Sequence, residues 1–134
     1  MPDWAAPAIQ FCRALEYELR RRLYEPQANC YELPKVGFTL GTIPFAYSNR
    51  KHNSTAWMNW NLFGSLITRS KSSMEEFEYF LNRMLDSRIY QQRNELAHGE
   101  PITKEAASAI RDCVIGDSDQ PGILCWLAKQ VDAS

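Results

Sequence analysis

The stretch SMEEFEYFLNRMLDSRIYQQRNELAHGEP, residues 73–101, holds the longest periodic run of the chain. Its apolar side chains recur every three or four positions, which is the pattern of an amphipathic helix. Ser73 followed by Glu76 predicts a capping box at the start of this helix, and Gly99 and Pro101 predict its end. One long helix is therefore expected, with an inward stripe made by Phe77, Phe80, Leu81, Met84, Leu85 and Ile89.

Before this run, the sequence predicts a first long helix from Asp3, as its N-cap, to about Tyr24, stopped by Pro26. Residues 26–37 contain prolines, an asparagine and a glycine and are expected to form a long connector. Residues 38–47 are apolar and short, with Thr39 as a possible cap. Pro44 within them predicts an irregular or kinked piece of one or two turns.

A polar loop at residues 48–55 precedes a further helix that is expected to end near Thr68. Its helically spaced apolar residues are interpreted as core or dimer interface rather than as a base-stacking platform: Trp57, Trp60, Phe63, Leu66 and Ile67. After the long run, two helices are expected at residues 103–115, capped by Thr103 and closed by Gly116, and from Pro121 to about Val131.

No segment alternates with period two, and no repeats occur. The sequence therefore predicts an all-α protein, an up-and-down bundle of about five helices with one long N-terminal connector. A length of 134 residues suits a single domain over 1–134.

The composition argues against membrane-spanning, secreted and metal-binding proteins. No apolar run is long enough to cross a bilayer and the N-terminus lacks a signal-peptide pattern, so neither a membrane span nor secretion is expected. The four cysteines are scattered, with no Cys-x-x-Cys pair and no histidine at ligand spacing. We expect free, mostly buried thiols, a cytoplasmic location, and no metal or other cofactor.

A net charge of −1 predicts no global attraction to nucleic acid. Any such contact must come from local clusters, of which the chain has two, at residues 20–22 and at residues 50–52. Each cluster is either a solvated surface or a local contact for nucleic acid.

Two charged residues interrupt apolar stripes. Glu16 falls within the stripe of the first helix, and Arg93 lies four residues beyond Ile89, at the next position of the stripe of the long helix. A guanidinium on an inward or interface face needs an anionic partner. Glu16 is either an acid at the edge of its stripe that reaches water or a carboxylate that needs a cationic partner. An Arg93–Glu16 pair, within one chain or across a dimer, would satisfy both residues.

His98 lies five residues after Arg93, which is about 140° away around an unbroken helix. Because Gly99 and Pro101 break the helix there, we expect a distorted last turn that lets the imidazole reach the arginine's side. The other explanation is a histidine that simply favours a helix C-terminus. Spacing alone leaves both explanations open.

Arginine and histidine together suit phosphodiester chemistry on RNA. A neutral imidazole can take the proton of a ribose 2′-OH, and a guanidinium can stabilise the charge that develops on the phosphate. Asn94 could hold a phosphate or orient the histidine. One histidine cannot comfortably serve as both base and acid, so a symmetric dimer that brings two copies together is expected.

The motif Arg93-Asn94-Glu95-Leu96-Ala97-His98, followed by Gly99, resembles the Arg-x(4–6)-His motif of the all-α HEPN domain family. The first-helix segment CRALEYELRRRL, the piece FTLGTI, and RNELAHGEPIT running into a further helix are in an order similar to HEPN proteins. The resemblance covers most of the chain except residues 44–75.

The resemblance implies a dimeric helical bundle with a composite cleft, acting as a metal-independent endoribonuclease in defence, stress or toxin–antitoxin systems. Arg93, Asn94 and His98 would be catalytic, with Glu16 in support. Members of one subgroup carry a tyrosine two residues after the histidine, which their antitoxin modifies; Glu100 stands there in this chain. The expected partners are RNA, a second copy, and a regulatory or antitoxin partner or additional domain. The alternative is a non-catalytic HEPN-like module that dimerises or binds nucleotides or RNA.

Overall fold

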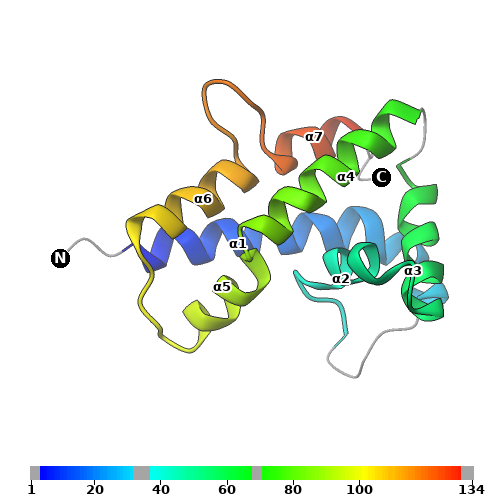
Figure 1. The fold of residues 1–134 in the computed structure, drawn as a ribbon, viewed down its shortest axis with the longest axis horizontal. Coiled ribbons are helices and arrows are strands. Elements are labelled where there is room, and N and C mark those ends of the chain that lie inside the picture. Colours follow the sequence, from blue (N-terminus) through cyan, green and yellow to red (C-terminus); the bar gives the residue numbers. More distant parts are fainter. Residues whose placement is uncertain (1–3, 32–36, 68–70, 131–134) are drawn as a thin grey trace.

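The computed structural model describes residues 4–31, 37–67 and 71–130, and within them the chain forms helices and no strand. These described residues hold seven α-helices (Figure 1): α1 (Ala5–Leu19), α2 (Thr42–Asn49), α3 (Ser54–Ser65), α4 (Lys71–Asp86), α5 (Ile89–Ala97), α6 (Lys104–Val114) and α7 (Ile123–Gln130). The expectation of an all-helical fold is confirmed for the described residues. The count of α-helices differs from the expected five or so, because the expected long helix is two helices and the short piece at residues 38–47 is a regular helix.

The first helix ends at Tyr24, as expected. α1 passes without interruption into a π-helical segment, η1 (Arg20–Tyr24), and a 3₁₀ segment, η2 (Glu25–Cys30), follows, in which Gln27 leaves the helical conformation with φ of −133° and ψ of 33°. Pro26 lies in the first turn of η2, where a missing N–H leaves no helical bond unmade. Trp4 precedes α1 as N-cap without a side-chain bond. The expected cap Asp3 lies outside the described residues.

The short second piece is a regular helix. Pro44 occupies the first turn of α2, so it removes no hydrogen bond and causes no kink. The start of α2 is tied by the hydroxyl of Thr42, which accepts a hydrogen bond from the N–H of Thr39 at 2.8 Å. Asn53 then caps α3 by accepting from the N–H of Ala56 at 3.0 Å.

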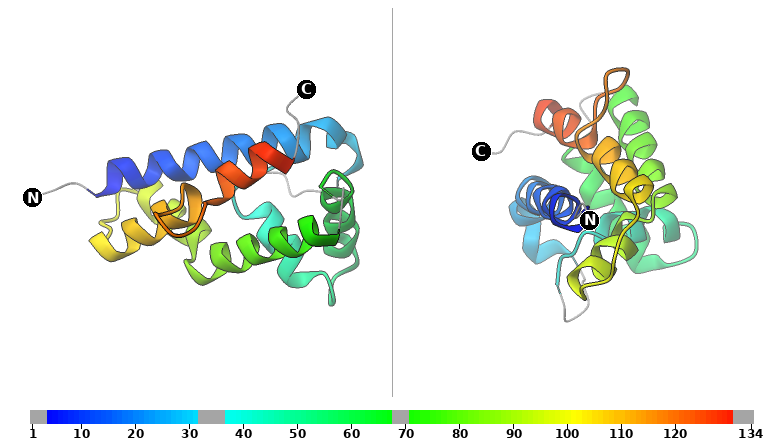
Figure 2. Two further views of the ribbon diagram at one scale, coloured as in Figure 1. Left: turned by 90° about the horizontal axis from the view of Figure 1, so that it is seen from above. Right: turned by 90° about the vertical axis from the view of Figure 1, so that its left-hand side faces the viewer.

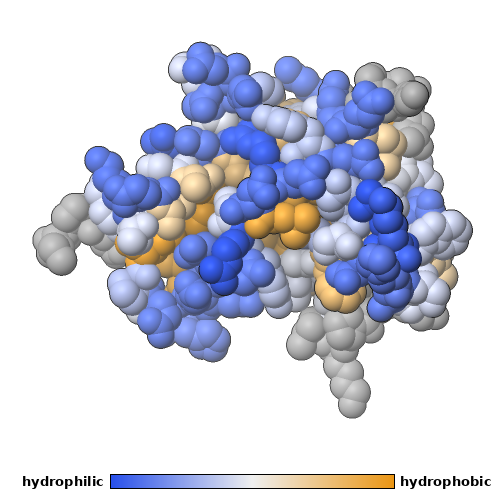
Figure 3. Space-filling view, viewed as in Figure 1, coloured by the Kyte–Doolittle hydropathy of each residue, from blue (hydrophilic) through white to orange (hydrophobic). Residues whose placement is uncertain are grey.

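The expected long helix is two helices. The chain turns between α4 and α5 at Arg88, a non-glycine residue in the left-handed conformation with φ of 53°. The apolar stripe is broken at the same place, since Leu85 is 38% exposed while Leu81 and Ile89 are buried. An apolar patch lies over the C-terminal half of α4 in Figure 3. The side chain of Ser73 lies outside the described residues, so the capping box at the start of α4 stays a prediction.

The last two helices follow the expected signals closely. Thr103 caps α6 by accepting from the N–H of Ala106 at 3.1 Å, and Gly116 follows its end with φ of 95°. Pro121 is not in the first turn of α7; it pairs with Gly116 in an isolated bridge that closes the intervening loop. α7 begins two residues later, at Ile123.

The helices enclose one apolar core. α1 runs along the length of the molecule and packs against α5, α6 and α7, whereas α3 lies across the end of the bundle (Figures 1 and 2). A stack of three aromatic rings joins α3, α4 and α7, with Trp60 on Phe77 at 5.5 Å and Phe77 on Trp126 at 5.6 Å. Most of the α3 aromatics are thus core, but Trp57 is 59% exposed. Among the described residues, no helix is both long and apolar enough to cross a bilayer.

Candidate functional site

The centre of the candidate site is the carboxylate of Glu16 on α1. Its Oε2 atom accepts a hydrogen bond from the backbone N–H of Leu40 at 3.1 Å and lies 3.5 Å from Nε of Arg93 on α5. The expected Arg93–Glu16 pair therefore forms within one chain. Both side chains are mostly shielded from solvent, with exposed fractions of 32% for Arg93 and 25% for Glu16. Each half-buried charge is thus stabilised by the other.

The backbone at residues 40–41 is a part of this site that the sequence did not predict. Besides the bond from Leu40, Gly41 lies against the ring of Tyr90 on α5, so closely that a Cβ atom at this glycine would lie 2.8 Å from ring carbons. Such a contact does not occur between real side chains, and only glycine fits. The FTLGTI segment thus fixes the position of α5 against α1, and with it the position of Arg93.

Only one of the three guanidinium nitrogens of Arg93 faces a partner among the described residues. Glu16 faces its Nε, and neither of its two terminal nitrogens makes a hydrogen bond to any residue that the structure describes. A guanidinium with available terminal N–H groups can bind carboxylate or phosphate oxygens in a fork geometry. The arrangement therefore holds an anion-binding group in a fixed orientation.

Cys12 lies one helical turn before Glu16 and is fully buried. Burial raises the pKa of its thiol to about 12, although the positive charge of Arg93 opposes the shift. The same burial raises the pKa of Cys113 on α6 to about 11. Both side chains are thus protonated thiols at neutral pH and do not act as nucleophiles. Cys30 and Cys125 are exposed, so half of the free cysteines are buried rather than most of them.

His98 is the C-cap of α5: its N–H still bonds to the carbonyl of Asn94 at 3.2 Å, whereas its own φ of −92° and ψ of 8° leave the helical region. The chain reverses one residue later, at Gly99, with φ of 80°. The N–H of Gly99 bonds to the carbonyl of Leu96 at 3.1 Å, and that of Glu100 bonds to the carbonyl of Glu95 at 2.9 Å. This pair of bonds is a Schellman motif, which ends the helix in an ordered way.

The structure therefore places His98 with Asn94 and not with Arg93. Asn94 and His98 are four residues apart, on one face of α5. Together with Glu95, Glu100 and Pro101 they line an open hollow of about 480 Å³, to which Arg93 does not contribute. Within one chain, no contact of the described residues joins His98 to Arg93, because helical hydrogen bonding continues to the N–H of His98 and the chain reverses only at Gly99.

Two carboxylates flank the histidine in this hollow. Glu95 and Glu100 occupy the two positions of the Schellman motif that usually hold a pair of apolar side chains. His98 itself is exposed. This helix end is thus polar and open to solvent, and its imidazole is accessible to a second macromolecule.

The two basic clusters differ from an open nucleic-acid surface. Arg21 and Arg22 both pair with Glu18, at 3.0 and 2.7 Å, and Arg20 lies 3.7 Å from Glu25. In the second cluster, the guanidinium of Arg50 lies 4.3 Å from the centre of the Tyr47 ring. The neighbouring residues 51 and 52 are exposed. Most of these charges are therefore balanced or packed within the chain.

In the part of the chain that the structure describes, no group of three or more histidine, cysteine or acidic side chains is placed to hold a metal ion. No protein-family model, no curated protein and no solved structure matches this chain significantly. What the chain does must therefore be inferred from its residues and their geometry.

Proposed function

We propose that this chain is a metal-independent endoribonuclease of the HEPN type, with a composite site that forms when two copies meet. Arg93 stabilises negative charge on the scissile phosphate, His98 transfers the proton of the ribose 2′-OH, and Asn94 orients the phosphate or the imidazole. Glu16 holds Arg93 in place. The products would carry 2′,3′-cyclic phosphate and 5′-hydroxyl ends.

The observation that carries the proposal is the way in which one short helix presents two kinds of group. Glu16 holds Arg93 of α5 through its Nε, the terminal nitrogens make no bond to the residues that the structure describes, and α5 presents Asn94 and His98 on an adjacent, open face. A guanidinium fixed by a half-buried carboxylate, beside an accessible imidazole, suits a reaction that needs charge stabilisation and proton transfer together.

A second copy completes the set of groups. Within one chain, Arg93 and His98 face different ways, and one imidazole cannot conveniently act as both base and acid. Two α5 helices related by a two-fold axis would bring Arg93 of one copy toward His98 of the other and would supply a second imidazole. A dimer is therefore part of the proposed mechanism.

The test is cleavage of single-stranded RNA by purified protein in EDTA. Wild type is expected to cut, whereas His98→Ala and Arg93→Ala should each lose at least about 10²-fold in rate, the usual effect of removing a general acid–base or charge-stabilising group. The matched control is His52→Ala, which removes the other histidine of the chain at an exposed loop position and should keep full activity. Cleavage that persists in both site variants, or that disappears with chelator, would refute the mechanism.

Mixing the two inactive variants tests the composite site. If Arg93 and His98 act across a dimer, heterodimers of Arg93→Ala with His98→Ala contain one intact Arg93 facing one intact His98, and cleavage should return in part, limited by the missing second imidazole. Absence of recovery, with heterodimers verified by native mass spectrometry, would contradict the composite arrangement.

A non-catalytic HEPN-like module is the second candidate, and one observation favours it. Glu95 and Glu100 lie beside His98 in the same hollow and repel the phosphates of RNA. Of the two roles of such a module, dimerisation through this face fits the carboxylates, whereas binding of a nucleotide or RNA without cleavage would have to overcome their repulsion. If the chain is a nuclease, these carboxylates and the net charge of −1 give it weak intrinsic affinity for RNA. A regulatory or antitoxin partner, or an additional domain, would then direct it to its RNA substrate.

A further inference from the structure

A second concave surface lies at the other end of the molecule, away from α5. The N-terminal half of α4, the loop between α6 and α7, and α7 itself surround a groove of about 560 Å³. Figure 1 shows the loop at the top, with α7 and the N-terminal part of α4 to its right, whereas α5 is at the lower left. We call this surface the α4–α7 groove; its walls include Glu75, Glu76, Tyr79, Phe80, Pro121 and Trp126.

The loop that forms one rim of the groove is held in shape by its own bonds. One carboxylate oxygen of Asp117 accepts hydrogen bonds from the N–H groups of Asp119 and Gln120, at 2.8 and 2.9 Å. The bridge between Gly116 and Pro121 closes the base of the loop. The hydroxyl of Tyr79 donates to the side-chain oxygen of Gln120 and ties the loop to α4. The groove is therefore already formed without a ligand.

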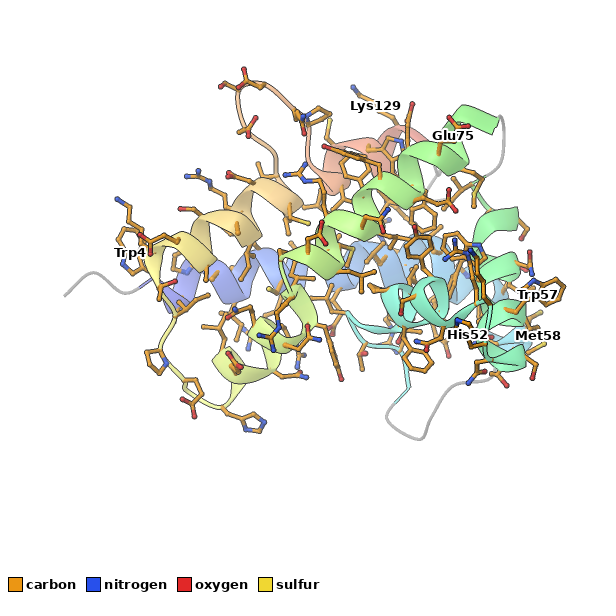
Figure 4. All side chains as sticks on the ribbon, in the orientation of Figure 1. Trp4, His52, Trp57, Met58, Glu75 and Lys129 are labelled. Carbon is orange, nitrogen blue, oxygen red and sulfur yellow. The ribbon has the colours of Figure 1, made fainter. Side chains whose placement is uncertain are left out.

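The interior of the groove combines aromatic rings with carboxylates. The Trp126 ring is packed between Phe77 and Phe80, and its indole N–H donates to Oε2 of Glu76. Tyr79 is 46% exposed at the edge. Glu75 lies at the outer side of α4, as Figure 4 shows. Among the described residues that line the groove, none carries a positive charge. The nearby Arg83 is not in the wall; its guanidinium lies 5.8 Å from the centre of the Tyr79 ring, and its Nη2 atom donates to the carbonyl of Asp112.

We propose that the α4–α7 groove binds an arginine side chain of an extended segment of a partner protein. A guanidinium is planar, so it can lie against the side of the Tyr79 ring opposite Arg83 while its N–H groups reach the carboxylates of Glu75 and Glu76. The apolar stem of the arginine, and an apolar neighbour in the partner, would cover Phe80 and Pro121. The carboxylates repel nucleic acid, so this surface serves a protein partner and is independent of the RNA chemistry proposed for α5.

The charge of the ligand is the feature to test. Uniformly ¹⁵N-labelled full-length protein would be titrated with the peptide acetyl-Leu-Arg-Leu-amide and, separately, with the same peptide carrying citrulline, which is nearly isosteric with arginine and neutral. The readout is the indole N–H resonance of Trp126, which reports on the hydrogen bond to Glu76. The arginine peptide should shift it saturably, and the citrulline peptide should bind at least about 5-fold more weakly because it lacks the cation.

Two variants locate the charge. Glu75→Gln and Glu76→Gln should each reduce the affinity for the arginine peptide several-fold; glutamine at position 76 can still accept the Trp126 bond, so the fold is retained. Glu105→Gln on α6 removes a carboxylate that is exposed and outside the groove, and should change nothing. Three results would overturn the proposal: both peptides bind equally, the Trp126 resonance does not shift, or it shifts with protein concentration in the absence of peptide. The last result would assign the groove to a second copy.

Discussion

The link between Glu16 and Arg93 leads to a quantitative prediction, because one carboxylate oxygen serves two partners. Oε2 of Glu16 accepts from Leu40 and faces Nε of Arg93, so it joins α1, the segment before α2, and α5. Glu16→Ala removes both interactions. Glu16→Gln retains an acceptor for Leu40 and removes only the charge.

The expected magnitudes follow from the half-buried position of the pair. Loss of the bond from Leu40 leaves a partly buried donor unpaired and should destabilise the fold by about 1 kcal/mol. Loss of a partly screened ion pair should add about 0.5–1 kcal/mol. Glu16→Ala should therefore lower the free energy of unfolding by about 1.5–2 kcal/mol, and Glu16→Gln by about 0.5–1 kcal/mol.

The assay is urea unfolding followed by tryptophan fluorescence, in a double-mutant cycle of Glu16→Gln with Arg93→Met. Methionine retains much of the apolar stem of the arginine, so the cycle isolates the charge pair. The coupling free energy should be about 0.5–1 kcal/mol, above the scatter of roughly 0.3 kcal/mol for independent sites. Glu18→Gln is the matched control: its partners Arg21 and Arg22 are on the same helical stretch, so it should not couple to Arg93→Met.

Two results would refute this reasoning. Equal losses for Glu16→Ala and Glu16→Gln would mean that the bond from Leu40 contributes nothing. A coupling energy indistinguishable from zero would mean that the pair is only a close approach. Reversal of both charges, Glu16→Lys with Arg93→Glu, should restore the ion pair but leave a deficit of about 1 kcal/mol, because Leu40 then has no acceptor.

Three further predictions concern the backbone and the thiols. Arg88→Gly should stabilise the protein by up to about 1 kcal/mol in urea unfolding, because glycine adopts the left-handed conformation of this position without strain. Gly99→Ala should lower the melting temperature modestly, because the only obstacle to alanine is the positive φ of this position. Gly116→Ala should lower the melting temperature far more, because a Cβ atom there would also collide with the backbone nitrogen of Gly122. At pH 8, a thiol reagent should modify the two exposed cysteines and, until urea is added, spare the two buried ones, whose pKa values are raised to about 12 and about 11.

The parts of the fold that depend on local chemistry could be predicted from the sequence. Thr103 and Asn53 cap helices where a short polar side chain precedes an apolar run, and the turn at Gly116 has the positive φ that favours glycine. The Arg93–Glu16 pair could be predicted for a related reason. A charge in an apolar stripe needs a partner, and each of the two stripes contained one such charge.

The break at Arg88 could not be predicted in this way. No glycine or proline marks it, and the apolar period continues across it from Leu81 to Ile89. The left-handed conformation of an arginine costs about 1 kcal/mol. Burial of Ile89 and Leu96 provides roughly 1.5–3 kcal/mol for each side chain and outweighs that cost. The break is therefore a result of tertiary packing, which a local pattern does not contain.

The same break decides what the candidate site can be. At Arg88 the chain leaves the line of α4 and brings α5 onto α1, as the left-hand view of Figure 2 shows. Arg93 consequently faces Glu16 and becomes fixed, while the face of α5 that carries Asn94 and His98 stays open. A regular helix cannot turn both residues inward, because about 140° separates positions five apart. If Arg93 and His98 act on one phosphate, the imidazole must therefore come from another chain, and the helical geometry itself is the reason to look for a dimer.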